Sequence, residues 1–315
     1  MTPREGAIQR KGTGAGAGSG PLLRSPARLF WRFGDSQIRL DGPRVMGIVN
    51  LTPDSFSDGG GLPDLETALD HARAMVAEGA ALVDVGGEST RPGARPVPEE
   101  EELARILPFL RRASRELGVP LSVDTRKAAV ARAALEAGAS VVNDVSGFAH
   151  DPLMASVVAR AGAGAVLMHM RGEPTTMGAL ATYQDVAAEV AAELEVAVER
   201  ARSAGVPDAA LVLDPGLGFA KTAAQSMALL RDLEPLHALG FPVLVGPSRK
   251  SFLGAVLGVP PRERGPGTVA ACVVAYLGGA RIFRVHDVGP VAQALAVAHA
   301  ILGSADGEEG EVQAR

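Results

Sequence analysis

The sequence predicts an α/β protein with a single (β/α)8 TIM-barrel domain, and three observations lead to this prediction. Eight short runs of β-branched and apolar residues recur along the 315-residue chain. Most are apolar along their whole length, as in parallel strands that are covered on both faces. The Ala-rich stretches between them have helical length, and several end in glycine, which best tolerates a left-handed helix terminus. Such alternation is typical of this barrel, which commonly fills about 250 residues.

The expected strands and helices alternate from residue 45 to residue 285. The strands are Val45–Val49, Ala81–Val85, Leu121–Val123, Val141–Val145, Ala165–Met168, Leu211–Leu213, Val243–Val245 and Ile282–Val285. The helical stretches include Leu65–Glu78, Pro98–Leu117, Lys127–Ala137, Tyr183–Ala204 and Ala223–Leu239. An open doubly wound sheet is the alternative, but it normally carries a glycine-rich phosphate turn after its first strand. The segment Asn50–Asp54 holds that position here and is not glycine-rich, which favours the barrel.

The barrel domain is expected to span residues 29–303. Residues 1–28 include a stretch, Gly14 to Gly20, made only of Gly, Ala and Ser, and we expect a disordered, flexible N-terminal extension. Its basic start is not followed by a continuous apolar run, so a secretory signal peptide is not indicated, and a transit peptide is the weaker alternative. Residues 304–315 are expected to form a flexible C-terminal tail.

Composition indicates a globular protein without a nucleic-acid or membrane partner. Hydrophobic residues make up 47% of the chain and charged residues 21%, with a net charge of -5 and both signs interspersed. No stretch approaches the roughly 20 apolar residues of a membrane span. Cys272 is the only cysteine, so no disulfide can form within the chain. This fits a reducing compartment, and we expect a cytoplasmic protein.

Polar and charged residues follow the expected strands at their C-terminal ends, where barrel enzymes build their sites. They are Asn50, Asp84, Glu88, Asp124, Asn143, Asp144, His169, Asp214, Ser248, Arg249, Lys250, Arg284 and His286. Each alone has a structural explanation: Asp124 could cap a helix, and His169 could be a satisfied core histidine. Capping does not explain why all of them gather at one end of the barrel. We therefore interpret this end as a binding site.

The side chains at this end fall into two chemical groups. The acceptors for the N–H groups of a flat heterocycle are Asp124, Asn143 and Asp214. A carboxylate can accept two parallel hydrogen bonds from an amino-pyrimidine edge. The cationic donors suited to phosphate oxygens are Arg91, Arg284 and His286. Asn50 adds a hard oxygen of the kind that Mg²⁺ prefers. The residues predict an acceptor-rich pocket beside an anion pocket.

Eight motifs resemble those of the dihydropteroate synthase family, in order and one to each expected barrel segment. They are Gly47–Gly60, Gly86–Ala94, Ser122–Thr125, Val142–Gly147, Met168–Met170, Asp214–Phe219, Gly246–Phe252 and Arg284–Val288. The resemblance covers about residues 37–300. Two positions depart from the pattern: Ala220 stands where the family often has glycine, and Ser226 where asparagine is common. Both bear on local loop geometry.

The resemblance implies a transferase of folate biosynthesis. Such an enzyme condenses p-aminobenzoate with (7,8-dihydropterin-6-yl)methyl diphosphate to give 7,8-dihydropteroate and diphosphate, with Mg²⁺ as cofactor. It also implies a cytoplasmic homodimer that sulfonamides target. The implied substrate-binding residues are Asn50, Thr90, Arg91, Pro92, Asp124, Asn143, Asp214, Phe219, Lys250, Ser251, Arg284 and His286. The implied catalytic residues among them are Asp124, Lys250, Arg284 and His286.

The resemblance divides these residues among three pockets. For Mg²⁺ and the diphosphate they are Asn50, the metal ligand, with Arg284 and His286. For the pterin ring they are Asp124, Asn143, Asp214 and Lys250. For p-aminobenzoate they are Thr90, Arg91, Pro92, Phe219 and Ser251, and two mobile loops, 52–60 and 89–95, are implied to close over both substrates. Ser251 is expected at a helix start, where free N–H groups favour a carboxylate.

Two other functions stay open at this point. A methyltransferase that uses methyltetrahydrofolate shares a pterin-binding barrel, but it has no use for a diphosphate pocket. A non-catalytic relative that binds a pterin or a partner protein is the other. The run Glu99–Glu102 is interpreted as a solvated helix face rather than a metal site. The remaining histidines are interpreted as surface or packing residues: His71, His150, His237 and His299.

Overall fold

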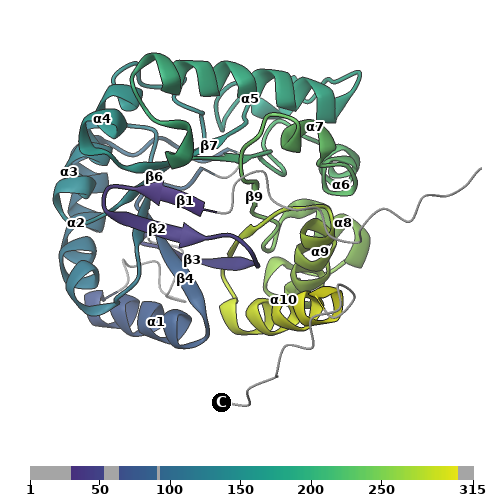
Figure 1. Ribbon diagram of the computed structural model, residues 1–315, viewed down its shortest axis with the longest axis horizontal. Coiled ribbons are helices and arrows are strands. Elements are labelled where there is room, and N and C mark those ends of the chain that lie inside the picture. Colours follow the sequence, from purple (N-terminus) through teal and green to yellow (C-terminus); the bar gives the residue numbers. More distant parts are fainter. Residues whose placement is uncertain (1–29, 53–63, 91–92, 304–315) are drawn as a thin grey trace, which may run out of the picture.

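The computed structural model describes residues 30–52, 64–90 and 93–303, and its centre is a barrel of eight parallel strands (Figure 1). In chain order these strands are β3 (Arg44–Asn50), β4 (Ala80–Gly86), β5 (Leu121–Asp124), β6 (Val141–Asp144), β7 (Gly164–Met168), β8 (Leu211–Asp214), β9 (Leu244–Val245) and β10 (Ile282–Val285). Their order in the sheet is β8-β7-β6-β5-β4-β3-β10-β9. A parallel bridge between Leu213 and Val243 joins the two outer strands and closes the barrel.

Helices form the outer layer around these strands (Figure 1). They are α1 (Leu65–Ala77), α2 (Glu99–Glu116), α3 (Ala128–Glu136), α4 (Met154–Ala161), α5 (Val186–Ser203), α6 (Ala223–Arg231), α7 (Glu234–His237), α8 (Ser251–Leu257), α9 (Gly265–Leu277) and α10 (Val288–Gly303). Short 3-10 turns are η1 (Met177–Leu180), η2 (Asp208–Ala210) and η3 (Pro261–Glu263). Among the described residues, no helix has the length and apolar character that a membrane span requires.

The strands are apolar on both faces because each face packs against a separate core. The outward faces carry residues such as Val85, which packs with Ile106 and Phe109 of α2 in the layer between strands and helices. The inward faces carry residues such as Met46 and Leu82, which fill the barrel interior. Both sets are removed from water. This explains the continuous apolar runs in the sequence.

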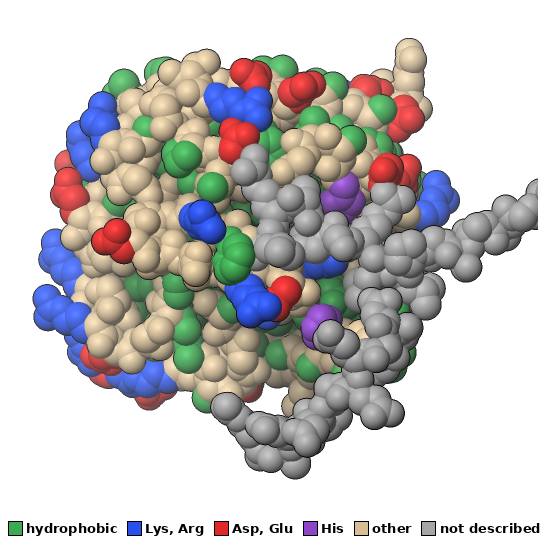
Figure 2. All heavy atoms as spheres, in the orientation of Figure 1, with side chains coloured by type: hydrophobic (Ala, Val, Ile, Leu, Met, Phe, Trp, Pro, Cys, Tyr) green, Lys and Arg blue, Asp and Glu red, His purple; other side chains and the backbone are tan. Residues whose placement is uncertain are grey.

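An antiparallel hairpin closes the N-terminal end of the barrel. It consists of β1 (Phe30–Phe33) and β2 (Ser36–Arg39), which lie in front of the barrel in Figure 1. Its inward side chains are Trp31, Phe33 and Ile38, which with Leu40 pack on the inward residues of the strands. The indole Nε1 of Trp31 donates a 2.8 Å hydrogen bond to the carbonyl of Ala210. Figure 2 shows this face, with charged side chains of both signs dispersed around it.

The predicted barrel is confirmed, and the prediction missed three features. The hairpin of β1 and β2 was not expected. The stretch Ala223–Leu239, expected as one helix, contains two, because α6 ends at Arg231 and α7 begins at Glu234. The seventh strand, expected as Val243–Val245, is β9 with only Leu244 and Val245. The predicted extensions, residues 1–28 and 304–315, lie outside the described residues.

Candidate active site

Charged side chains from three strands meet at the C-terminal end of the barrel. Arg284 of β10 donates from Nε to Asp84 Oδ2 at 2.6 Å and from Nη2 to Asp124 Oδ2 at 2.7 Å. Asn143 of β6 donates from Nδ2 to the same Asp84 oxygen at 3.0 Å. Parallel strands bring these positions together because their carboxyl ends share one rim. We call Asp84, Asp124, Asn143 and Arg284 the acidic ring.

The acidic ring keeps unused acceptors in a buried place. Asp84 is fully buried and Asp124 nearly so. Within the described part of the chain, Oδ1 of each of these carboxylates has no hydrogen-bond partner. A buried polar atom without a partner costs about 1–3 kcal/mol, so folded proteins retain few of them. Two such oxygens at one rim indicate a place for N–H donors of a ligand.

Burial dominates the electrostatics of the ring. It raises the pKa of Asp124 to about 7, with Asp84 adding to the rise and Arg284 opposing it. Burial also disfavours the charge of Arg284, yet the carboxylates of Asp84 and Asp124 hold its pKa above the usual value. Two carboxylates held close together out of water repel each other. Such an arrangement is typical of a functional site, where a ligand interacts with them.

A second acceptor, Asp214, stands at the end of β8 beside the turn that follows it. Its Oδ1 accepts a 2.8 Å hydrogen bond from the N–H of Gly216. Burial raises the pKa of Asp214, and the charges of Lys250 and Arg284 oppose that rise. The ammonium of Lys250 lies 4.1 Å from the centre of the Phe219 ring. Asp214, Phe219 and Lys250 thus form one wall of the site.

The loop between β9 and α8 meets the end of β10 through Ser248 and Arg249. The ring Nδ1 of His286 lies 2.9 Å from the hydroxyl of Ser248. Arg249 adopts a positive φ of 57°, which is rare for a residue with a side chain. Two hydrogen bonds to Asp287, of 3.2 and 2.6 Å, hold its guanidinium. Ser251 begins α8, as predicted, and is exposed.

Asn50 ends β3 next to the acidic ring. A Cβ placed on Gly86 would lie 3.6 Å both from Asn50 Oδ1 and from Asp124 Cβ, so Gly86 leaves room between these side chains. No group of three or more His, Cys, Asp or Glu side chains suited to a metal occurs in the described ranges. A single amide oxygen suits only a cation such as Mg²⁺, which takes few protein ligands and completes its shell with phosphates and water.

The remaining predicted residues fall in the segment after β4. Thr90 is half-buried. Arg91 and Pro92 lie outside the described residues. The segment around them is tied down at Val97, whose carbonyl accepts from Lys127 Nζ at 2.7 Å. The same ammonium bridges the buried carboxylates of Glu88 and Glu102, each at 2.5 Å. Glu102, expected on a solvated face, is fully buried in this contact.

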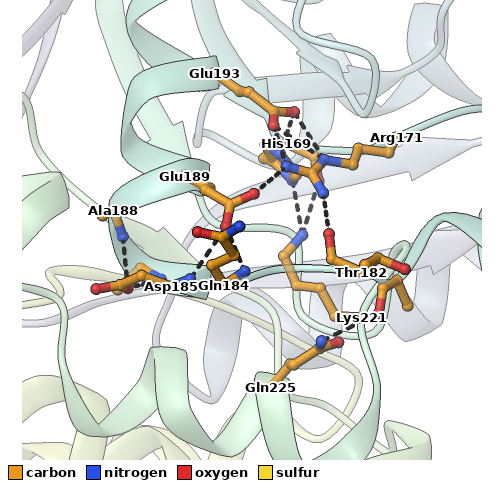
Figure 3. Close-up of polar contacts among 12 residues, drawn as sticks. His169, Arg171, Thr182, Gln184, Asp185, Ala188, Glu189, Glu193, Lys221 and Gln225 are labelled. Carbon is orange, nitrogen blue, oxygen red and sulfur yellow. Dashed lines mark hydrogen bonds and ion pairs between the residues drawn. The ribbon is translucent and has the colours of Figure 1, made fainter.

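The structure adds two features to the predicted site. Asp84 was noticed at a strand end but not assigned a role, although it accepts from both Arg284 and Asn143. Its signal was a charged residue inside an otherwise apolar strand. Lys221 was not noticed at all. It is buried beside His169, which contacts Glu193 of α5 (Figure 3). A single lysine in a loop gives no sequence signal for such a contact.

The site suits a flat heterocycle that carries N–H donors and an anionic group. The acidic ring and Asp214 offer carboxylate oxygens to ring donors. His286, beside Ser248, follows the end of β10, and Asn50, beside Gly86, ends β3. Nothing in this set resembles a nucleophile paired with a base. The arrangement therefore favours binding, orientation and charge stabilisation over covalent catalysis.

Comparisons with known proteins agree with this chemistry. A family model described as "Pterin binding enzyme" matches residues 46–286. A dihydropteroate synthase of Synechocystis is 51% identical over 258 residues, which cover 82% of this chain and 89% of that protein. The solved dihydropteroate synthase of Yersinia pestis in complex with a sulfonamide drug superposes with a TM-score of 0.83 at 42% identity, covering 87% of this chain and 99% of that one. That of Xanthomonas albilineans with 4-aminobenzoic acid gives 0.81 at 44% identity, covering 87% and 98%.

Proposed function

The chain belongs to the dihydropteroate synthase family of pterin-binding enzymes, and we propose that the acidic ring and Asp214 hold the pterin of its substrate. The reaction is a transfer: p-aminobenzoate replaces diphosphate on the methylene carbon of (7,8-dihydropterin-6-yl)methyl diphosphate, which gives 7,8-dihydropteroate. The residue roles that follow are proposals about how this chain performs it.

The unpaired Oδ1 atom of Asp124 is the observation that carries the proposal. It is buried, its partner oxygen is held by Arg284, and its own acceptor capacity is unused among the described residues. The pterin has adjacent amino and ring N–H groups along one edge. A carboxylate facing that edge forms paired hydrogen bonds, which are strong because the acceptor is charged. Asn143, Asp214 and Lys250 would contact the rest of the ring.

The diphosphate is assigned to the rim beside Asn50 and His286. The hydroxyl of Ser248 orients the His286 ring through its Nδ1. Arg284 donates from Nε to Asp84 and from Nη2 to Asp124, and we assign its Nη1 group to a phosphate oxygen. Asn50 would supply the protein oxygen for Mg²⁺. Bound there, Mg²⁺ would supply positive charge to offset the charge of the departing diphosphate.

Catalysis in this scheme needs positioning and electrostatics but no strong base. The methylene carbon shares positive charge with the pterin ring, so diphosphate departs before the amine attacks. The carbon–oxygen bond breaks with its electron pair on the diphosphate, and the amine nitrogen then forms the new bond with its lone pair and gives up a proton to solvent. Asp124 and Asp214, as carboxylates near the ring, favour this positive charge. Lys250 packs over the aromatic ring of Phe219 and limits the space around the pterin ring.

The second substrate is assigned to the pocket bordered by Phe219 and the start of α8. Ser251 is exposed at the start of α8, where the N–H groups of the first helical turn would face the carboxylate of p-aminobenzoate. Thr90, Arg91 and Pro92 are proposed to complete this pocket. A sulfonamide, which has the shape of p-aminobenzoate, would occupy the same place. The solved relatives include one with 4-aminobenzoic acid and one with a sulfonamide drug, which supports substrates of this chemical class.

We further infer a homodimer formed through α9 and α10. These helices pack on each other, and neither contains an Asp, Glu, Lys or Arg. Their exposed apolar side chains are Val274, Leu277, Val297 and Ile301. An uncharged apolar face of this kind marks a protein interface. Val297→Glu should therefore give a monomer by analytical ultracentrifugation, whereas Val196→Glu on α5, equally exposed and apolar, should leave the dimer intact.

A cytoplasmic location is part of the proposal as well. Cys272, the only cysteine, is buried in α9, and burial raises the pKa of its thiol to about 12. A thiol in this state neither reacts nor bridges readily, which suits a reducing compartment.

The test of the proposed function is diphosphate release by the purified chain. With both substrates and Mg²⁺ present, release should depend on p-aminobenzoate and should yield dihydropteroate in equal amount. The matched variant is Asp124→Asn, which keeps the shape but removes one acceptor, and it should reduce release roughly 10- to 100-fold. No release by the unmodified chain would refute the proposed function, and full release by the variant would refute the assignment of the acidic ring.

A further inference from the structure

Lys221 makes its contacts at the end of the turn that follows β8 (Figure 3). Its side chain is only 8% exposed. The Nζ atom lies 2.8 Å from His169 Nδ1 and donates to the carbonyl of Phe219 at 2.9 Å. A buried ammonium is unfavourable unless its hydrogens are donated in hydrogen bonds. Here the ring of His169, which directly follows β7, and the carbonyl of Phe219 accept them. One ammonium therefore joins two loops of the site.

His169 connects Lys221 to α5. Burial and the charge of Lys221 lower the pKa of His169 to about 4, so its ring is neutral at neutral pH. With Nδ1 accepting from Lys221, the ring proton sits on Nε2 and is donated to Glu193 Oε2 at 2.9 Å. Glu193 is also bonded by Arg171, whose guanidinium lies 3.9 Å from the centre of the Tyr183 ring. The chain of contacts runs from the surface of α5 to the Phe219 carbonyl.

The turn that Lys221 holds is close-packed and strained. Gly216 adopts a φ of 68°, and a Cβ there would lie 2.0 Å from the carbonyl oxygen of His169. Ala220, between Phe219 and Lys221, has a positive φ of 48° in spite of its side chain. A residue held in this region persists only when its surroundings enforce it. The bond from Lys221 to the Phe219 carbonyl spans this residue and closes the turn.

We propose that Lys221 is a positioning residue for p-aminobenzoate. Its ammonium, held by His169, whose ring Glu193 holds in turn, fixes the Phe219 carbonyl and thereby places the Phe219 ring against Lys250. This inference rests on the proposed function, because it assigns Phe219 to the p-aminobenzoate pocket. Lys221 contacts no substrate in this scheme. It acts through the position of the aromatic wall, whereas Asp214, on the other side of the turn, is held separately by the Gly216 N–H.

The charges around Lys221 make its hold on the turn depend on pH. Burial lowers the pKa of Lys221 to about 7. The charged groups that face it come from β8, α5 and two loops: Asp214 and Glu193 favour the ammonium, and Arg171 and Lys250 oppose it. The ammonium is therefore present at pH values below about 7 and is lost as the pH rises. The charge-assisted bond to Phe219 weakens in the same direction.

The experiment measures kcat and KM for p-aminobenzoate at saturating pterin diphosphate and Mg²⁺. Lys221→Met keeps an unbranched side chain in the buried space but removes the donor. At about pH 6 it should raise this KM about tenfold or more, as expected for a lost hydrogen bond from a charged group, and change kcat less. Glu193→Gln, at the exposed end of the chain, should raise KM in the same direction but less. Glu195→Gln, an exposed glutamate on the same helix, is the control and should change neither.

The pH profile separates positioning from a merely structural role. In the unmodified enzyme, KM for p-aminobenzoate should rise as the pH increases through about 7. In Lys221→Met this rise should be absent. Thermal unfolding and binding of the pterin diphosphate, followed in parallel, report whether the variant is folded. If Lys221→Met does not fold, Glu193→Gln carries the test, with a smaller rise of KM and the pH dependence shifted to lower pH.

The outcomes are distinct. An unchanged KM in both variants overturns the inference, as does an equal loss of affinity for both substrates together with a lower melting temperature. A pH profile that is the same with and without Lys221 also overturns it. Failure of the unmodified chain to release diphosphate would instead refute the proposed function, and with it the premise of this inference.

Discussion

The two ends of the barrel solve opposite problems with the same eight strands. At the N-terminal end, Trp31, Phe33 and Leu40 pack into an apolar plug whose one buried donor, the indole N–H, is satisfied. At the C-terminal end, Asp84 and Asp124 are equally buried but keep oxygens that no described residue uses. The first end stabilises the fold through area removed from water. The second stores unfavourable charge.

This difference indicates where each kind of substitution should act. Changes in the plug should alter the free energy of unfolding and leave substrate affinity as it is. Changes in the acidic ring should alter affinity and catalysis, and some should even stabilise the fold, because they remove buried charge.

The largest effect is expected in the plug. Trp31→Ala should lower the free energy of unfolding by about 3–5 kcal/mol, because it removes a fully buried indole and leaves a cavity. Urea unfolding measures this change. At low temperature the folded fraction should keep its KM values. Arg32→Ala, the exposed neighbour, is the control and should shift the free energy by less than about 0.5 kcal/mol. A variant that stays stable but loses substrate affinity would break the comparison.

At the other end, Arg284→Met should act mainly on catalysis. It removes the cation shared by Asp84 and Asp124, and kcat/KM for diphosphate release should fall about 100-fold or more. The protein should stay folded, since the freed carboxylates can take up protons. Arg284→Lys keeps the charge without the planar fork and should be intermediate. Steady-state kinetics beside urea unfolding would contradict the idea if stability fell and kcat/KM did not.

A smaller loss is expected for Asp214→Asn. Oδ1 can still accept from the Gly216 N–H, so the turn should survive, but the other oxygen becomes an NH₂ donor. Pterin affinity should fall by about 1–3 kcal/mol, or roughly 10- to 100-fold, by calorimetry. Asp232→Asn is the control, an exposed aspartate that also accepts a backbone N–H. Unchanged pterin affinity would remove Asp214 from the site.

The smallest effect is the pH dependence of pterin binding. The ionised form of Asp124 accepts the ring N–H groups, so affinity should fall as the pH drops through about 7, by at most about tenfold per pH unit. Stability should change in the opposite sense. A carboxyl whose folded pKa is raised contributes stability at low pH that is lost as the pH rises from about 4 to about 7.

Calorimetric titration of pterin over this range, with thermal unfolding in the same buffers, measures both trends. Burial also raises the pKa of Asp214, and its titration adds to both trends. Asp124→Asn should flatten part of each curve. If affinity and stability rose together with pH, the acidic ring would be an ordinary set of ion pairs and not a store of unfavourable charge.

The sequence predicted which polar residues meet at the C-terminal rim better than it predicted the plug. Asp124, Asn143 and Arg284 could be found because each follows an apolar strand, and parallel strands bring their carboxyl ends to one rim. The hairpin was missed although Trp31 and Phe33 alternate with polar neighbours, because two four-residue strands resemble an irregular lead-in to the barrel.

The contacts within the site were less predictable than its members. Asp84 pairs with Arg284 across 200 residues of sequence, and Lys221 reaches His169 across 52. Spacing along the chain gives no information about such distances. The same holds for Glu102, whose place in the run Glu99–Glu102 indicated a solvated face. The ammonium of Lys127, the residue just before α3, partly offsets the cost of burying it.

The hairpin also constrains the order in which the nascent chain can fold. Trp31 leaves the ribosome early, but the carbonyl that accepts its indole N–H belongs to Ala210, 179 residues later. At about 5–20 residues per second, translation needs roughly 10–35 seconds to deliver that partner. An isolated two-stranded hairpin is marginal in water, so Trp31 and Phe33 stay exposed during this interval. The hairpin therefore cannot complete its contacts until synthesis has reached Ala210, and its packing against Leu244 and Ile282 forms later still.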